Sequence, residues 1–185
     1  MKNVDMRFDI DLVRSWIGKK FYNYKCDPFV FTNSVTQIVG LYIDENVYAL
    51  TNIQESVDYF GSVEDIAVSK LSISKDCMIK SAFKDVEMTS TPINDEITSV
   101  KIVNEQQKMS VNGKPAYEVW FTRAIIIEAG GREISFEKDT VPFSEEIKIQ
   151  RGYDLLNTIS NNDDFLTEWD ADYSPEYKRE IILVN

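Results

Sequence analysis

The sequence predicts an α+β fold that is mainly antiparallel β, with about eight to ten strands in a curled sheet or partly open barrel. Three observations lead to this class. Apolar and polar residues alternate over most of residues 20–150, which is the period of a strand. Turn residues at 44–46, 112–113 and 129–131 separate pairs of these alternating segments. Helical spacing of apolar residues is confined to the two ends of the chain.

The amino-terminal end is predicted to form a helix over residues 9–17. Asp9 or Asp11 can cap it, because an aspartate carboxylate accepts hydrogen bonds from the free N–H groups of the first helical turn. Gly18 lies where helices commonly end in the left-handed conformation. The apolar residues would share one face of this helix: Phe8, Leu12, Val13, Trp16 and Ile17.

The first half of the chain is then expected to form strands at 20–26, 35–43, 47–53, 56–60 and 65–73. Asp44-Glu45-Asn46 makes a hairpin turn between the second and the third of them, because these residues tolerate the conformations of tight turns. Asp27-Pro28 ends the first strand, since proline cannot donate to a ladder of hydrogen bonds. Gly61-Ser62 separates the last two strands.

Residues 76–95 are the least regular part of the sequence, and we expect a helical turn followed by a loop around Pro92. Asn112-Gly113 and Gly130-Gly131 are strong hairpin signals, because both pairs tolerate positive φ. Ala124–Ile127 is apolar on both faces, which predicts a central position in the sheet. The strands expected around these turns lie at 97–109, 116–128, 132–138 and 146–150.

The carboxy-terminal end is predicted to contain two short helices, at about 153–160 and 163–169, and a closing strand at 179–184. Leu155, Leu156 and Ile159 give the first of these helices its apolar face. Asp163 or Asp164 can cap the second.

The chain is expected to form a single domain over residues 1–185, because no stretch has the composition of a linker. Within it, two segments at about 35–73 and 117–151 share a faint pattern: a hairpin, a gap, a phenylalanine, small residues, two acids and a short apolar strand. This echo is either a pseudo-duplication of two β-units or a chance match in an acidic sequence that is rich in strands. If the echo is a true repeat, a pocket would most naturally lie between the units, lined by tyrosines and tryptophans.

Composition limits the classes of function. The chain has 185 residues, with 31 acidic against 20 basic residues, a net charge of −11 and no histidine. Catalytic pairs and metal sites that need an imidazole are therefore excluded. The acidic balance disfavours binding to the phosphate backbone of nucleic acids and to anionic membranes. Acidity is common among soluble cytoplasmic proteins, and the sharper alternative is an acidic surface that binds a basic partner.

The sequence also predicts a soluble, cytoplasmic protein without a cofactor. Its amino-terminal residues are charged instead of forming an apolar signal segment, and no apolar stretch is long enough to span a bilayer. Cys26 and Cys77 match no metal-binding spacing, so both are expected to be reduced thiols. No phosphate-binding or dinucleotide-binding motif is present.

The acidic carboxy-terminal segment carries the candidate binding residues. Four aromatic residues recur every fourth position from residue 165 to residue 177, and no basic residue lies between Arg151 and Lys178. The structural interpretation is a capping helix with aromatic anchors, and the functional one is an edge that binds a basic protein. Mg²⁺ or Ca²⁺ binding by Asp170 and Asp172 is a further alternative, without the glycine-containing loop of a calcium site. The candidates are Asp164, Glu168, Trp169, Asp170, Asp172 and Tyr173.

An enzymatic interpretation depends on Asp139, Glu146 and Lys148. Metal-dependent nucleases of the PD-(D/E)xK kind use an Asp, a Glu and a Lys in this order, where the carboxylates hold Mg²⁺ and the lysine helps to position the attacking water. The pattern is weak, since Glu176-Tyr177-Lys178 repeats it by chance. Solvent-facing charges on an edge strand explain the same residues.

The leading hypothesis is a non-enzymatic protein that binds a macromolecular partner. Its alternatives are a metal-dependent hydrolase or nuclease that uses a carboxylate cluster, and a small-ligand binder with a pocket between the two β-units. Converging carboxylates in a cleft would favour the hydrolase, and an apolar pocket with a few inward polar groups would favour a binding protein.

Overall fold

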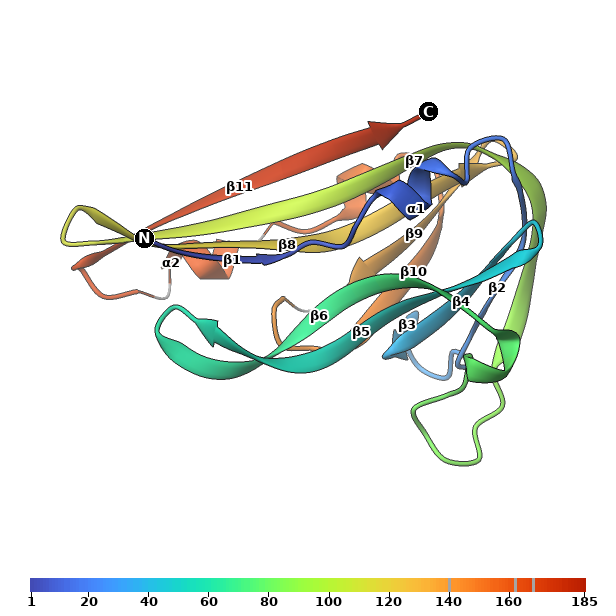
Figure 1. Ribbon diagram of the computed structural model, residues 1–185, viewed down its shortest axis with the longest axis horizontal. Coiled ribbons are helices and arrows are strands. Elements are labelled where there is room, and N and C mark those ends of the chain that lie inside the picture. Colours follow the sequence, from blue (N-terminus) through green and yellow to red (C-terminus); the bar gives the residue numbers. More distant parts are fainter. Residues whose placement is uncertain (140, 162, 168) are drawn as a thin grey trace.

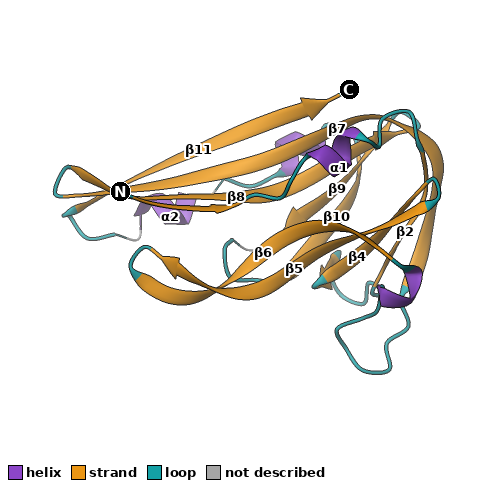
Figure 2. Ribbon diagram, in the orientation of Figure 1, coloured by secondary structure: helices purple, strands orange, loops and turns teal. Residues whose placement is uncertain are grey.

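The computed structural model describes residues 1–185 except Thr140, Asn162 and Glu168. Within the described residues, the chain forms eleven strands, two short α-helices and two short 3₁₀ helices, so strands dominate the fold (Figure 2). In chain order the elements are β1 (Lys2–Met6), α1 (Asp11–Arg14), β2 (Lys20–Cys26), β3 (Ser34–Thr36), β4 (Ile38–Ile43), β5 (Asn46–Tyr59), β6 (Ser62–Ser74), η1 (Asp76–Met78), β7 (Thr89–Val111), β8 (Lys114–Ala129), β9 (Arg132–Lys138), β10 (Glu146–Gly152), η2 (Leu155–Thr158), α2 (Asp163–Thr167) and β11 (Tyr173–Val184).

The strands form one curled sheet that folds over into two layers (Figure 1). Its main order is β3-β10-β9-β8-β7-β2-β4-β5-β6, with β1 added in parallel to β8 and β11 added antiparallel to β7. β7 connects the layers: its first part pairs with β2, and its remainder, from Ile97 onward, pairs with β8. The order does not return to its starting strand, so the predicted open, mainly antiparallel sheet is confirmed.

The chain also passes from one layer to the other at Gln37, between β3 and β4. The backbone of Gln37 is left-handed, with φ 68°, so the chain changes direction there and β3 pairs with β10 while β4 pairs with β5. The Gln37 N–H donates to the carbonyl of Glu145 at 3.1 Å, and its own carbonyl accepts from the N–H of Asn52 at 2.8 Å. The backbone of this one residue therefore links the edges of the two layers.

The three predicted hairpins are confirmed. The turns follow Ile43, Val111 and Ala129, whose register partners are Asn46, Lys114 and Arg132. Gly130 is required at the third turn, because its φ is +60° and a Cβ there would collide with the carboxylate of Asp95.

Apolar side chains fill the space between the layers and also cover the outer face of β8. Ile125 and Ile127 belong to the main core between the layers, whereas Ala124 and Ile126 pack under η2 with Leu155 on the opposite face. Both faces of this segment are thus buried, and β8 lies between β7 and β9 as a central strand.

The helices are shorter than the sequence pattern suggests. The predicted helix at 9–17 is reduced to one turn, α1, although Val13 and Trp16 are fully buried as its apolar spacing implied. The N–H of Trp16 donates to the carbonyl of Val13 at 3.0 Å, so the backbone tightens to an i→i−3 bond after Arg14. The predicted helices near 153–160 and 163–169 correspond to η2 and α2. None of the described helices has the length and apolarity needed to cross a membrane.

The chain has more strand than predicted. The expected loop around Pro92 was wrong, because β7 already begins at Thr89 and pairs with β2. The closing strand β11 begins at Tyr173, six residues before the predicted start, and pairs with β7 along its whole length. Pro175 fits within β11, because β11 has no described strand on its other side and proline is tolerated on edge strands.

The two segments that the sequence pattern likens to one another have related local topology. β4-β5-β6 and β8-β9-β10 are both three-stranded antiparallel meanders with consecutive neighbours. Their origin by duplication stays a prediction.

Candidate functional site

A groove of about 270 Å³ lies between the end of β5, the segment that follows β9, and α2. We call it the aromatic groove, because four of its eight lining residues are aromatic. The eight lining residues are Tyr59, Gln107, Val141, Pro142, Phe143, Asp164, Phe165 and Trp169. It joins parts of the chain that are more than 100 positions apart. Tyr59 comes from the first β-unit, Phe143 from the second, and Trp169 from the acidic carboxy-terminal segment.

The hairpin between β5 and β6 positions one wall of the groove. Its turn is formed by Phe60 and Gly61, both with positive φ (52° and 98°), so that Tyr59 pairs directly with Ser62. A Cβ on Gly61 would lie 2.9 Å from the hydroxyl of Tyr117, so a glycine is needed there for steric as well as conformational reasons.

Phe60 connects this hairpin to α2. Its ring lies 5.4 Å from that of Phe165, 5.5 Å from that of Trp169 and 5.6 Å from that of Tyr117, measured between ring centroids. These separations are typical of favourable aromatic contacts. Phe60 therefore packs between β8 and α2, and it holds the helix against the tip of the hairpin.

The opposite wall of the groove is formed by the regularly spaced aromatic residues of the carboxy-terminal segment. Phe165 and Trp169 pack edge to face at 5.7 Å, and the indole N–H of Trp169 donates to the carbonyl of Phe165 at 2.7 Å. Trp169 in turn contacts Tyr173 at 5.6 Å. The predicted stripe is therefore real from 165 to 173, but α2 ends at Thr167 and Tyr173 already belongs to β11.

The floor of the groove is polar. Gln107 on β7 is buried, and its Oε1 accepts a hydrogen bond from the hydroxyl of Tyr59 at 2.6 Å. Burial raises the pKa of Tyr59 above its ordinary value, so this hydroxyl stays protonated and serves as a donor. The ring of Tyr59 also packs edge to face on Phe143 at 6.0 Å, which ties the floor to the exposed rim.

The rim is acidic. Asp164 is the charged residue among those that line the groove, and Asp163, Asp170 and Asp172 lie close to it in sequence and are exposed. Among the described residues, no lysine or arginine forms an ion pair with any of these four aspartates. The groove therefore contains one carboxylate, that of Asp164, without an ion pair among the described residues.

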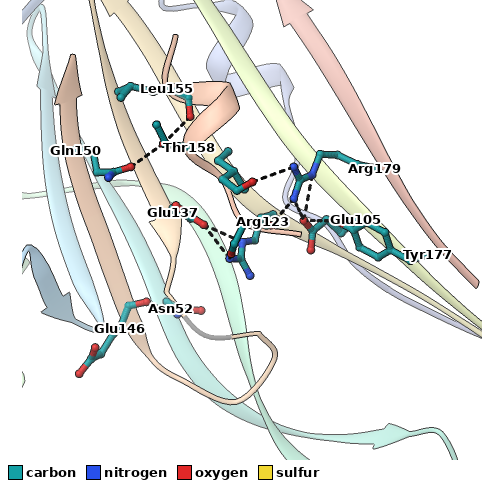
Figure 3. Close-up of polar contacts among 12 residues, drawn as sticks. Asn52, Glu105, Arg123, Glu137, Glu146, Gln150, Leu155, Thr158, Tyr177 and Arg179 are labelled. Carbon is teal, nitrogen blue, oxygen red and sulfur yellow. Dashed lines mark hydrogen bonds and ion pairs between the residues drawn. The ribbon is translucent and has the colours of Figure 1, made fainter. Parts of the chain in front are cut away.

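A second group of polar residues includes Glu105 of β7 and Arg123 of β8 (Figure 3). We call it the buried charge cluster: Glu105, Arg123, Glu137, Lys138, Tyr177 and Arg179. The guanidinium of Arg179 donates to Glu105 Oε1 at 2.7 Å, and Tyr177 donates to the same oxygen at 2.5 Å. The guanidinium of Arg123 donates to Glu137 Oε1 at 2.8 Å. Glu105 is fully buried and lies two residues from Gln107 on β7.

Lys138 has no carboxylate partner within the described residues. Its ammonium group donates to the carbonyl of Ala67 on β6, and its side chain is buried. The pKa of Lys138 is lowered to about 7, mainly by desolvation and also by the positive charge of Arg123, while Glu105 opposes the change. Lys138 and Arg123 line an internal cavity of only about 10 Å³, about the space of one water molecule, so a substrate cannot reach the amine there.

Among the candidate catalytic residues, Asp139 and Glu146 are backbone neighbours, and their catalytic role stays a prediction. The N–H of Asp139 donates to the carbonyl of Glu146 at 3.0 Å, which is a backbone contact, and Lys148 lies opposite Glu137 in the register of β9 and β10. The carboxylate of Glu146 is exposed and points away from the buried charge cluster (Figure 3). Over the described part of the chain, no three acidic or cysteine side chains gather as metal ligands would. The hydrolase alternative receives no support from this arrangement.

Two of the six candidate binding residues line the groove. They are Asp164 and Trp169, and Tyr173 packs beside Trp169. Asp170 and Asp172 lie in the exposed turn before β11, and Glu168 lies outside the described residues.

Sequence reasoning missed Tyr59 and Gln107, which have no local signal. The sequence pattern shared by the two β-units does include Phe60 and Phe143. Phe60 packs against the groove residue Phe165, and Phe143 lines the groove itself.

Comparisons with models of protein families, with curated proteins and with solved structures found no match. The geometry of the aromatic groove is therefore the basis for assigning a function.

Proposed function

We propose that the chain is a non-enzymatic binding protein that holds a segment of a macromolecular partner in the aromatic groove. The observation that carries this proposal is the groove itself, which has four aromatic rings, a buried amide and a carboxylate around one opening. Aromatic side chains dominate the energetically important contacts of protein interfaces, because they bury large areas and lose little conformational freedom.

The size of the groove favours a side chain over a free small ligand. Pockets for drug-sized ligands usually measure about 300–1,000 Å³ and enclose most of their ligand. At about 270 Å³ and with Phe143 half exposed at its rim, the groove suits one or two side chains of a longer segment. The remainder of such a segment would lie across the rim, where polar contacts are normal for an interface.

The proposal is tested by selecting peptides from a random library displayed on phage, with immobilised protein as the target. Phe143→Ala removes an aromatic wall residue that is 49% exposed, so the fold should tolerate it. Phe83→Ala is the matched control, since Phe83 is 56% exposed and lies in the loop between η1 and β7, outside the groove.

We expect selected peptides to bind the wild type and the Phe83→Ala protein equally and the Phe143→Ala protein at least about ten-fold more weakly. Selection of no peptide, or of peptides that bind the Phe143→Ala protein as well as the wild type, would count against the proposed function.

A further inference from the structure

We infer that the group received by the aromatic groove is a cationic side chain, and specifically an arginine; this inference rests on the proposed function. The walls include the aromatic rings of Tyr59, Phe143 and Trp169, and Asp164 adds a negative charge to the lining. Cations are attracted to the faces of aromatic rings, and a carboxylate beside the ring adds a hydrogen-bonding partner.

Charge complementarity also favours a cationic side chain. The segment 151–185 holds three basic and eight acidic residues, which gives −5, and its basic residues lie at Arg151, Lys178 and Arg179, outside the part that borders the groove. Arg179 is already paired with Glu105. A partner side chain that enters the groove therefore meets the carboxylate of Asp164 beside an acidic segment, which favours a cation over an acid.

The same chain already shows this mode of recognition between its own residues. The guanidinium of Arg7 lies 4.5 Å from the ring centroid of Trp120, and one of its nitrogens is 2.6 Å from Asp5 Oδ2. The indole N–H of Trp120 is satisfied by Glu118 at 2.8 Å, as that of Trp169 is satisfied by Phe165. Both tryptophans therefore have their N–H occupied and can act through the ring face.

Arginine fits these walls better than lysine. A guanidinium is planar, so it can stack on a ring and donate two parallel hydrogen bonds to one carboxylate at the same time. An ammonium group is compact and strongly hydrated, and it gains less from an aromatic surface. Asp164 and Trp169 line the same groove, so they offer the carboxylate and the aromatic ring that a guanidinium uses together.

The test compares two acetylated, amidated peptides, Gly-Arg-Gly-Arg-Gly and its counterpart with citrulline in place of arginine, at low ionic strength. Citrulline keeps the shape and removes the charge. Binding is followed by the indole ¹H–¹⁵N signal of Trp169, which is assigned from its loss in Trp169→Phe. We expect the arginine peptide to shift this signal and to bind at least about ten-fold more tightly than the citrulline peptide.

The charge partner is tested with two substitutions that change the net charge equally. Asp164→Asn removes a carboxylate that lines the groove and should weaken the arginine peptide by about two- to five-fold. Asp163→Asn removes its neighbour on α2, which does not line the groove, and should change affinity by less than about 1.5-fold.

Equal binding of the two peptides, or equal effects of Asp163→Asn and Asp164→Asn, would overturn the inference. If neither peptide binds while library-selected peptides still depend on Phe143, the inference fails and the proposed function stands. If the selection also yields nothing that depends on Phe143, both fail.

Discussion

Substitution of Lys138 by methionine should make the protein more stable, and by an amount that depends on pH. Lys138 is buried, has no carboxylate partner within the described residues, and donates to the carbonyl of Ala67. Methionine has a similar length without the charge. The arginines of the buried charge cluster keep their own partners, since Arg123 pairs with Glu137 and Arg179 pairs with Glu105.

The magnitude follows from the pKa of Lys138, which burial lowers from 10.5 to about 7. The unfolded chain keeps the proton up to about pH 10.5, so between these values the unfolded state binds more protons and the free energy of unfolding rises with pH. At pH 6 the buried lysine costs about 5 kcal/mol relative to a solvated one. Loss of the hydrogen bond to Ala67 offsets about 1–3 kcal/mol of this, which leaves a net gain of about 2–4 kcal/mol for Lys138→Met.

The assay is urea denaturation of both proteins between pH 6 and pH 8.5. The stability advantage of Lys138→Met should shrink by about 2 kcal/mol over this interval, because the folded wild type loses its buried charge as the pH passes about 7. Lys114→Met, at the exposed first residue of β8, controls for the change of net charge and should show no such trend. An advantage of Lys138→Met that stays constant from pH 6 to pH 8.5 would refute the reasoning.

The remaining predictions concern other features of the fold. Arg179→Met leaves the carboxylate of Glu105, which is fully buried, without its ion pair, and should lower the free energy of unfolding by about 3–5 kcal/mol in urea titrations. Gly61→Ala should cost about 1–3 kcal/mol in the same assay, because φ is +98° there and the new methyl group meets a tyrosine hydroxyl. Burial raises the pKa of Cys26 to about 12, whereas Cys77 is exposed, so a thiol reagent at pH 8 should modify one cysteine per folded chain and two in denaturant; rapid modification of both in the folded protein would contradict the burial.

The hairpins could be predicted from sequence because their determinants are local. Asn112-Gly113 and Gly130-Gly131 specify their turns through positive φ at adjacent residues, whatever the rest of the chain does. The start of β7 at Thr89 could not be predicted this way, since residues 89–96 gain their strand conformation by pairing with β2, about 70 positions earlier in the chain. Pro92 suggested a loop, and tertiary pairing overrode that local signal.

The candidate site likewise combines residues that could be predicted from local sequence with residues that only the fold brings together. Asp164 and Trp169 stood out in the sequence because acids and aromatic residues recur regularly near them. Tyr59 and Gln107 have no such pattern, and only the folding of β5 and β7 toward α2 brings them to the groove. The backbone pairing of Asp139 with Glu146, next to β9 and β10, is likewise a property of the fold that residue types alone do not specify.

Because β7 belongs to both layers of the sheet, it affects how the protein folds. Because one continuous strand contributes backbone hydrogen bonds to both layers, neither layer can complete its sheet before β7 is in place. The other side of β7, from Val100 to Val111, is covered only when β11 pairs with it. Pairings this distant in sequence close large loops, so folding should be slow, and unfolding should be one concerted event in which the amides of β7 exchange with solvent last.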